Sequence, residues 1–431
     1  MKFAKLLAGV SLCLAAQFSQ AGVTIEHWQA PSGARVFFVE NHTLPIVDVQ
    51  LDFAAGTAYD PAGKSGLASL TRDLLDLGAG ALDETQTASR LADLGASLGG
   101  GADMDRANVS LRTLSATDKL TPALAILRDV VSAPRFDAAV FEREQARTIA
   151  ALKEALTRPE TIAARAFWSA MYAQHPYGVQ SSPESLTAIT RTDLVAFHAR
   201  HYGAARTTLT LVGDLTRARA EAIAAELTAA LPSGSDVAPP PELAPAVGSE
   251  RRIAHPAAQA HLLIGMPAVR RGDPDYFPLL VGNYTLGGGG FVSRLMKEVR
   301  DRRGYAYSVY SYFMPLQQPG PFNIGLQTKK AQAGAALKLT REVLAGFLAE
   351  GPSAEELQAA KLNLVGSFPL RLDSNRKILE NVASIGFYKL PLDYLDRYAE
   401  KVEAVSADDV RAAFARHVQA GKLTTVVVGG E

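Results

Sequence analysis

The chain has 431 residues, which is enough for two domains of about 200 residues, each with a sizeable core. Its 44 basic and 44 acidic side chains balance, so the totals give no sign of a nucleic-acid partner. A single cysteine, Cys13, excludes a disulfide within the chain.

The first residues are typical of a targeting segment. Lys2 and Lys5 precede an apolar run, Leu6–Ala16, and Ser19-Gln20-Ala21 supplies small residues for cleavage. We therefore expect a signal peptide over 1–21 and no membrane span in the mature chain, because the run is too short. The alternative is a retained N-terminal anchor. Removal of the segment also removes the cysteine, and an exported, cysteine-free chain of this size is typical of the bacterial periplasm.

Residues 22–231 are expected to form an N-terminal domain of mixed strands and helices, because apolar side chains recur there with both periods. The expected strands are 36–39, 46–53, 107–114 and 207–212, and the expected helices are 65–77, 85–94, 122–131, 141–156, 159–172 and 192–201.

A proline-rich linker over 232–249 follows, since no packed element tolerates prolines at that density. Residues 250–431 are then expected to form a C-terminal domain. Its expected strands are 261–266, 305–313 and 323–328, and its expected helices are 276–286, 291–300, 330–348, 353–368 and 374–386.

The two halves end alike. Asp193/Asp409, Arg200/Arg416, His201/His417 and Gly213/Gly429 are pairs of identical residues, and all of them are separated by the same offset in the numbering. A single offset across a helix and the strand after it predicts a duplicated α+β domain, with chance similarity as the alternative.

The stretch Asp60-Pro61-x-Gly63-Lys64-Ser65-Gly66-Leu67-Ala68 opens a helix, with Ser65 as its expected cap. This stretch resembles the zinc-binding helix of the pitrilysin/insulinase family of peptidases, whose frame is G-L-A-H-x-x-E-H. In that frame the two histidines and the glutamate are replaced by Ser69, Asp73 and Arg72.

The resemblance covers nearly the whole mature chain. Its further motifs are His175-Pro176-Tyr177-Gly178, Leu286-Gly287-Gly288-Gly289, Ser293-Arg294-Leu295 and the string from Glu298 to Val309. It implies an α+β fold of two homologous domains, each a mainly antiparallel sheet with helices packed on one side. The domains are expected to face each other like a clam shell around a cavity.

The replaced positions argue against zinc in this chain. A catalytic zinc needs three protein ligands and an open position. Asp73 can ligate, but Ser69 is a poor ligand and Arg72 repels a cation. The family's third ligand, a glutamate on the next long helix, falls where this chain has alanine. His198 and His201, one turn apart, are expected to be surface or cap residues instead of ligands.

Arg300 and Tyr307 lie where the family has an arginine and a tyrosine that reach the zinc site. There they bind the substrate main chain and stabilise the oxyanion, as fixed donors can. The alternatives are a surface ion pair, strand packing, and Tyr305 as the acting tyrosine. Gly287, Gly288, Gly289 and Gly290 lack the residues of a phosphate loop and are expected to contact substrate, as in some non-catalytic family members.

The leading hypothesis is a complementary subunit of a zinc peptidase that hydrolyses peptides. This chain supplies Arg300 and Tyr307, and a homologous partner with an intact H-x-x-E-H helix supplies the zinc. The alternative is an inactive peptide-binding or scaffold protein. A third hypothesis, an enzyme with an unrelated site of its own, lacks a recognisable set of side chains in the sequence.

Overall fold

The computed structural model describes residues 23–430, so the signal-peptide prediction lies outside the described residues. No helix within them is both long and apolar enough to cross a membrane. The first half contains β1 (Glu26–Gln29), β2 (Arg35–Glu40), β3 (Ile46–Phe53), α1 (Leu67–Asp73), β4 (Gly78–Ala79), β5 (Leu82–Asp83), α2 (Glu84–Leu94), β6 (Ser97–Ala102), β7 (Ala107–Leu114), α3 (Thr117–Ser132), α4 (Ala138–Ala155), α5 (Pro159–Met171), α6 (Pro183–Thr187), α7 (Arg191–His201), β8 (Thr208–Gly213) and α8 (Arg217–Ala229).

The second half repeats this plan. It contains β9 (Ser249–Ile253), β10 (Gln259–Val269), α9 (Tyr276–Asn283), a π-helix (Tyr284–Gly288), a second π-helical segment (Met296–Arg302), β11 (Ala306–Phe313), β12 (Gly320–Lys329), α10 (Ala333–Glu350), α11 (Ala354–Ser367), α12 (Asn375–Tyr388), α13 (Tyr398–Ala404), α14 (Ala407–His417) and β13 (Thr424–Val428).

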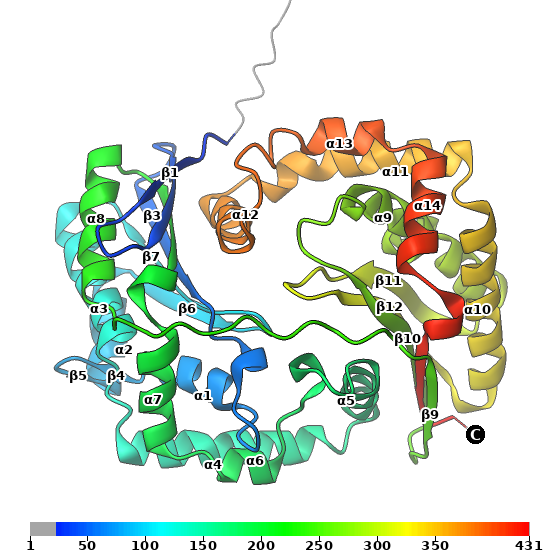
Figure 1. Ribbon diagram of the computed structural model, residues 1–431, viewed down its shortest axis with the longest axis horizontal. Coiled ribbons are helices and arrows are strands. Elements are labelled where there is room, and N and C mark those ends of the chain that lie inside the picture. Colours follow the sequence, from blue (N-terminus) through cyan, green and yellow to red (C-terminus); the bar gives the residue numbers. More distant parts are fainter. Residues whose placement is uncertain (1–22, 431) are drawn as a thin grey trace, which may run out of the picture.

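Each half is built on one mainly antiparallel sheet. The first sheet has the order β1-β2-β8-β3-β7-β6 and the second β9-β13-β10-β12-β11. Only β2–β8 and β13–β9 are parallel among these pairs. Apart from β1, the two sheets thus share one strand order and place their parallel pair at the same point, and the two halves lie side by side in Figure 1.

The common offset extends well beyond the ends of the halves. It places the first residues of α3, α4, α5 and α7 on the first residues of α10, α11, α12 and α14, respectively. The glycines that close β8 and β13, Gly213 and Gly429, both have positive φ, +140° and +81°. Such a backbone favours glycine, so the pair reflects one shared turn.

One helix of each half crosses to the sheet of the other half. α5 packs on β10 and β13, and α12 packs on β2, β3 and β8. In Figure 1 α12 is seen nearly end-on, beside the strands of the first half, and α5 lies beside the second half. This exchange buries the inner face of each sheet that its own outer helices leave uncovered.

The exchange also changes the environment of β3. Apolar and polar side chains alternate along β3, as in a half-buried strand, and the apolar ones line the outer core. However, Asp48, Gln50 and Asp52 on the other face are also buried, because α12 lies over them.

The proline-rich segment 232–248 contains no helix or strand but is held along its length. The Gln318 side chain donates to the Pro240 carbonyl at 3.0 Å, and the His175 ring contacts the Pro241 carbonyl at 2.9 Å. The segment is therefore an extended strap that hydrogen bonds hold in place between the halves.

Candidate functional site

The helix α1 begins in a different way from the one that the sequence predicts. Ser65 is not its cap; Gly66 precedes the helix with φ +105°. The cap is Asp60, whose carboxylate accepts from the backbone N–H groups of Gly66 and Ala68, both at 2.7 Å. Burial raises the pKa of this carboxyl to about 6. The Asp60-Pro61 motif therefore fixes the start of α1, which is shorter than 65–77.

Arg72 is buried, with 4% of its surface exposed, and joins α1 to the sheet. Its guanidinium donates to the carbonyls of Asn108 on β7 and Gly99 on β6, both at 2.5 Å. Asp76 lies 3.8 Å from it. A fixed cation thus occupies the middle of the lost metal motif, and it excludes a second cation from the same place.

The other two motif positions do not restore a metal site. Ser69 is half-buried and Asp73 is exposed. Desolvation by the surrounding protein raises the pKa of the Asp73 carboxyl, and neighbouring Arg72 opposes that shift. The nearby carboxylate of Glu144 is bonded to Arg143 at 2.9 Å and to Arg147 at 2.5 Å. The donor set does not fit zinc, because Arg72 places a fixed cation beside Asp73 and because Glu144 already has two cationic partners.

Arg300 and Tyr307 line one open pocket of about 420 Å³ in the second half. The guanidinium carbon of Arg300 lies 4.6 Å from the Phe291 ring centroid and 5.5 Å from that of Tyr307. Its ion pair with Asp301 is long, at 3.4 Å. Stacking between two aromatic rings holds the guanidinium while leaving N–H groups free to donate.

The backbone presents Tyr307 to solvent. The pairing of β11 with β12 shifts register between Ala306 and Val309, which is a β-bulge. The bulge turns Tyr307 outward with 88% of its surface exposed, whereas Tyr305 packs against the core of this half. Gly304, with φ +62°, ends the preceding helix and returns the chain into β11.

Three of the four predicted glycines line this pocket: Gly287, Gly288 and Gly290. A Cβ on Gly287 would lie 2.4 Å from the Ser311 hydroxyl, and one on Gly288 2.6 Å from the Asn283 amide. Gly289 would contact Tyr284 in the same way and does not line the pocket. Gly287 therefore allows the π-helix to pack closely on β11, and Gly288 and Gly289 allow close contact within the helical turn itself. Gly287, Gly288 and Gly290 add no side chain to the wall of the pocket.

The glycine turn and the lost metal motif occupy equivalent places. The offset that relates the two halves places Thr71–Leu74 in register with Gly287–Gly290. All residues that line the pocket come from the second half. Within residues 23–430, no hydrogen bond or ion pair joins Arg300 or Tyr307 to Ser69, Arg72 or Asp73.

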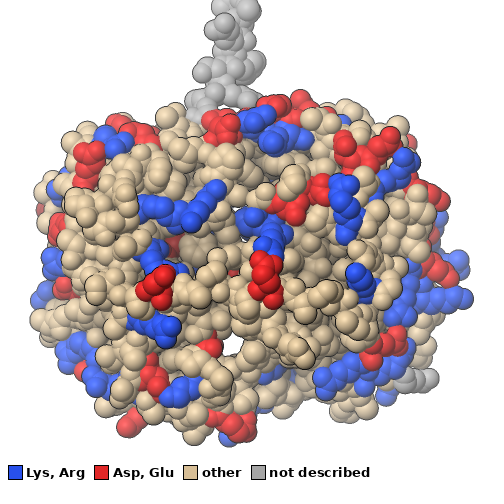
Figure 2. Space-filling view, in the orientation of Figure 1, with Lys and Arg blue, Asp and Glu red and all other residues tan. Residues whose placement is uncertain are grey.

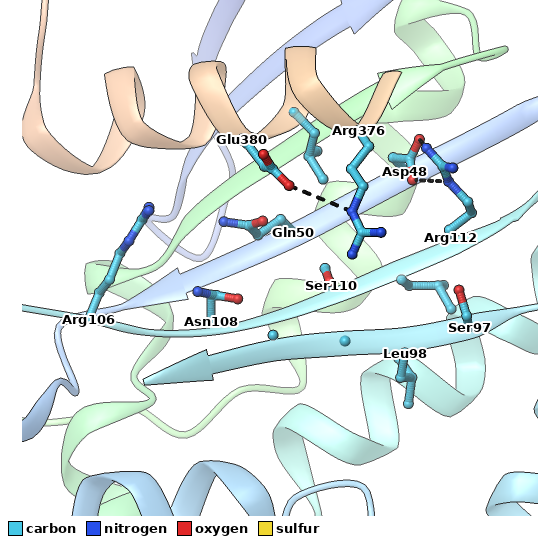
Figure 3. Close-up of a pocket in the computed structure, with 14 residues that line it drawn as sticks. Asp48, Gln50, Ser97, Leu98, Arg106, Asn108, Ser110, Arg112, Arg376 and Glu380 are labelled. Atoms are coloured by element: carbon cyan, nitrogen blue, oxygen red, sulfur yellow. Dashed lines mark hydrogen bonds and ion pairs between the residues drawn. The ribbon is translucent and has the colours of Figure 1, made fainter. Parts of the chain in front are cut away.

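A second, polar pocket of about 240 Å³ lies between the first sheet and α12 (Figure 3). Arg112 binds Asp48 with two hydrogen bonds of 2.8 and 2.9 Å. From α12, Arg376 faces the pocket and lies 3.6 Å from Glu380. No sequence pattern indicates this pocket, because its strands and its helix come from different halves. Its charges are internally paired.

The histidine prediction is wrong in one respect. His198 and His201 are buried, each with 6% exposure, and bond the carbonyls of Val131 and Ala54 at 2.9 and 3.1 Å. Burial lowers the pKa of both rings. Among the described residues, one cluster of three side chains has the geometry to hold a metal ion: Asp273, Asp275 and His417. There Arg416 already binds Asp275 with two bonds of 2.7 Å.

Comparison with known proteins gives two matching family models. The model of the insulinase family (peptidase family M16) matches residues 35–182, and the model described as the peptidase M16 inactive domain matches 188–364. A crystal structure of a peptidase M16 inactive domain from Pseudomonas fluorescens is 39% identical, with a TM-score of 0.92, over 95% of this chain and 99% of that one. This chain belongs to the insulinase family. The predicted fold class is confirmed.

The relatives of this insulinase-family chain include a protein named a non-peptidase and a protein named a zinc protease. A non-peptidase homologue of Helicobacter pylori is 25% identical over 402 residues, which is 92% of each chain. An uncharacterised zinc protease of Streptomyces coelicolor is 28% identical over 272 residues, 61% of this chain and 59% of that one. The matches to the inactive domain and the non-peptidase homologue support a non-catalytic member without zinc of its own.

Proposed function

We propose that this chain is the non-zinc subunit of a heteromeric zinc metallopeptidase. A homologous partner with an intact H-x-x-E-H helix would hold the zinc, which supplies an activated water for peptide hydrolysis. Arg300 and Tyr307 of this chain would bind the peptide main chain and stabilise the developing oxyanion. The observation that carries the proposal is the pairing of the half-buried Arg300 with the exposed Tyr307 in an open pocket.

The chemistry of the pair supports this role. The Arg300 guanidinium is oriented by the Phe291 and Tyr307 rings, and the Tyr307 hydroxyl is bonded to no other group within residues 23–430. Two oriented donors at an open pocket suit a carbonyl oxygen whose charge grows during reaction. Gly288 and Gly290 leave room beside them for a peptide main chain.

We further propose that the subunit works in the bacterial periplasm, on the basis of the basic and apolar N-terminal sequence. Basic and acidic side chains are interspersed over the face shown in Figure 2, so this face presents no basic field for nucleic acid.

The test is to purify the chain alone and together with an insulinase-family homologue that keeps the zinc motif. We expect peptide cleavage only from the mixture, and a complex on size-exclusion chromatography. A mixture that forms no complex and cleaves no faster than the homologue alone would refute the proposal.

The second candidate function is an inactive peptide-binding or scaffold protein. It is favoured by β6, a glycine-rich edge strand of the first sheet whose outer main-chain groups have no strand partner in the described part of the chain. Exposed edge strands can capture an extended peptide by strand addition. Peptide binding by this chain without any accelerated cleavage in the mixture would favour this function.

A further inference from the structure

The equivalent hairpin turns of the two halves meet at the centre of the molecule. The turn between β6 and β7 carries Asp105, which is fully buried. Its carboxylate accepts from the backbone N–H of Gln317 at 2.8 Å, in the turn between β11 and β12. These residues are 212 positions apart in the sequence. The two halves are thus joined through their hairpins.

Two tyrosines complete the junction around Asp105. Tyr177, from the His175–Gly178 motif, donates its hydroxyl to the carboxylate and accepts from the Gln318 N–H at 3.2 Å. Tyr388, the last residue of α12, donates to the same carboxylate at 2.9 Å. Asp105 therefore binds three donors from three separate segments.

A third tyrosine holds the same turn of the second half. Tyr172, which follows α5, donates its hydroxyl to the Pro319 carbonyl at 2.9 Å. The turn 314–319 thereby has three bonds to the first half, through Asp105, Tyr177 and Tyr172. This turn directly follows β11, the strand that carries Tyr307.

The Asp105 carboxylate forms no ion pair within the described residues. Its charge is stabilised by hydrogen bonds to neutral donors, and hydrogen bonds to a charged group are stronger than those between neutral groups. Since the carboxylate is fully buried, loss of one donor is not replaced by water. Loss of one hydrogen bond at this junction should therefore make the β11–β12 hairpin open more often.

We propose that the first half, which has lost its metal ligands, acts as a clamp on the β11–β12 hairpin, with Asp105 as its central acceptor. Asp105, Tyr172 and Tyr177 are then positioning residues for Tyr307. Within residues 23–430, β11 is an edge strand that pairs only with β12. No strand on its outer side stabilises it. The significance for catalysis rests on the proposed function, but the clamp itself does not.

Backbone hydrogen exchange on the full-length chain tests the clamp, because exchange reports local opening. The variants are Asp105→Asn, Tyr172→Phe and Tyr177→Phe. Matched controls are Tyr202→Phe and Tyr398→Phe, since these buried hydroxyls have no partner among the described residues. We expect amides of 306–329 to exchange about tenfold faster in each clamp variant, from the loss of one hydrogen bond to a charged or buried group.

Unchanged exchange in the hairpin, or an equal rise throughout the chain, would overturn the clamp. The tyrosine variants keep the test decisive if Asp105→Asn does not fold. A second measurement separates the clamp from the proposed function: turnover by the complex with the zinc-bearing homologue. Faster hairpin exchange with a lower kcat and an unchanged KM supports both, and faster exchange with unchanged kcat supports the clamp while contradicting the role of Tyr307.

Discussion

Tyr172 and Tyr388 are related by the offset between the halves and occupy equivalent positions, each at the end of the helix that crosses to the other half. Each donates its hydroxyl to the hairpin turn of the opposite half, Tyr172 to Pro319 and Tyr388 to Asp105. The duplicated unit thus contains its own means of joining a second unit. The exchange of α5 and α12 makes each sheet depend on the other half for its cover.

The exchanged helices predict that the two halves unfold together. Separating them would expose the apolar faces of α5 and α12 and the inner faces of both sheets. We expect one transition in denaturant, with coincident curves from tryptophan fluorescence and far-ultraviolet circular dichroism. Both tryptophans, Trp28 and Trp168, lie in the first half. A fluorescence transition that precedes the loss of circular dichroism would show independent unfolding.

Arg300→Ala and Tyr307→Phe should each lower turnover by the proposed complex while leaving assembly and zinc content intact. Loss of one oxyanion donor typically costs about 10²–10³ in rate. The loss should appear mainly in kcat, since the bond strengthens as charge develops. The matched control is Tyr305→Phe, which should be near neutral because the partly buried Tyr305 ring packs against the core and not in the pocket. Unchanged cleavage by both variants would contradict the composite site.

Arg72→Met should destabilise the chain by about 3 kcal/mol, because it leaves the partly buried carbonyls of Gly99 and Asn108 without donors. Methionine keeps most of the side-chain volume, so the loss reports the hydrogen bonds. Arg90→Met, at an exposed position of α2, is the control and should change stability by less than about 0.5 kcal/mol. Equal changes in the free energy of unfolding for the two substitutions, measured by urea denaturation, would show that the hydrogen bonds of Arg72 do not stabilise the fold.

The purified chain should contain no stoichiometric zinc and should cleave no peptide by itself. The reason is the buried cation at Arg72, together with the arginine partners that already occupy the carboxylate of Glu144 near Asp73. Metal content is measured by inductively coupled plasma mass spectrometry after dialysis against a weak chelator. One tightly bound zinc per chain that is lost in Asp73→Ala would contradict the interpretation of the lost motif.

Asp60 should make stability depend on pH. Its folded-state pKa is about 6 and lies above the ordinary value of 3.8, because the carboxyl is buried. Between these values the folded chain holds a proton that the unfolded chain has released, so this group stabilises the fold as pH falls from 7 to 4. The free energy of unfolding of the wild type minus that of Asp60→Asn should therefore rise over this range. A difference that is constant or falls would contradict it.

The sequence by itself determined the local chemistry of this protein. The single offset between the halves, the replaced Ser69, Arg72 and Asp73, and the Gly304 turn before Tyr307 are all readable from neighbouring residues or from an internal repeat. The offset predicted a duplicated α+β domain, and the motifs around these residues resembled those of the insulinase family. These features depend on backbone conformation and side-chain type within one or two turns, which the local sequence specifies.

Only the tertiary structure decided what the polar residues do. Asp105 meets partners 72, 212 and 283 residues away, and α12 converts the polar face of β3 from a solvent face into a buried one. Arg72 became a structural link only because Gly99 and Asn108 lie beside it. Such contacts join distant segments whose pairing is set by the packing of whole sheets and helices, and no local period in the sequence encodes them.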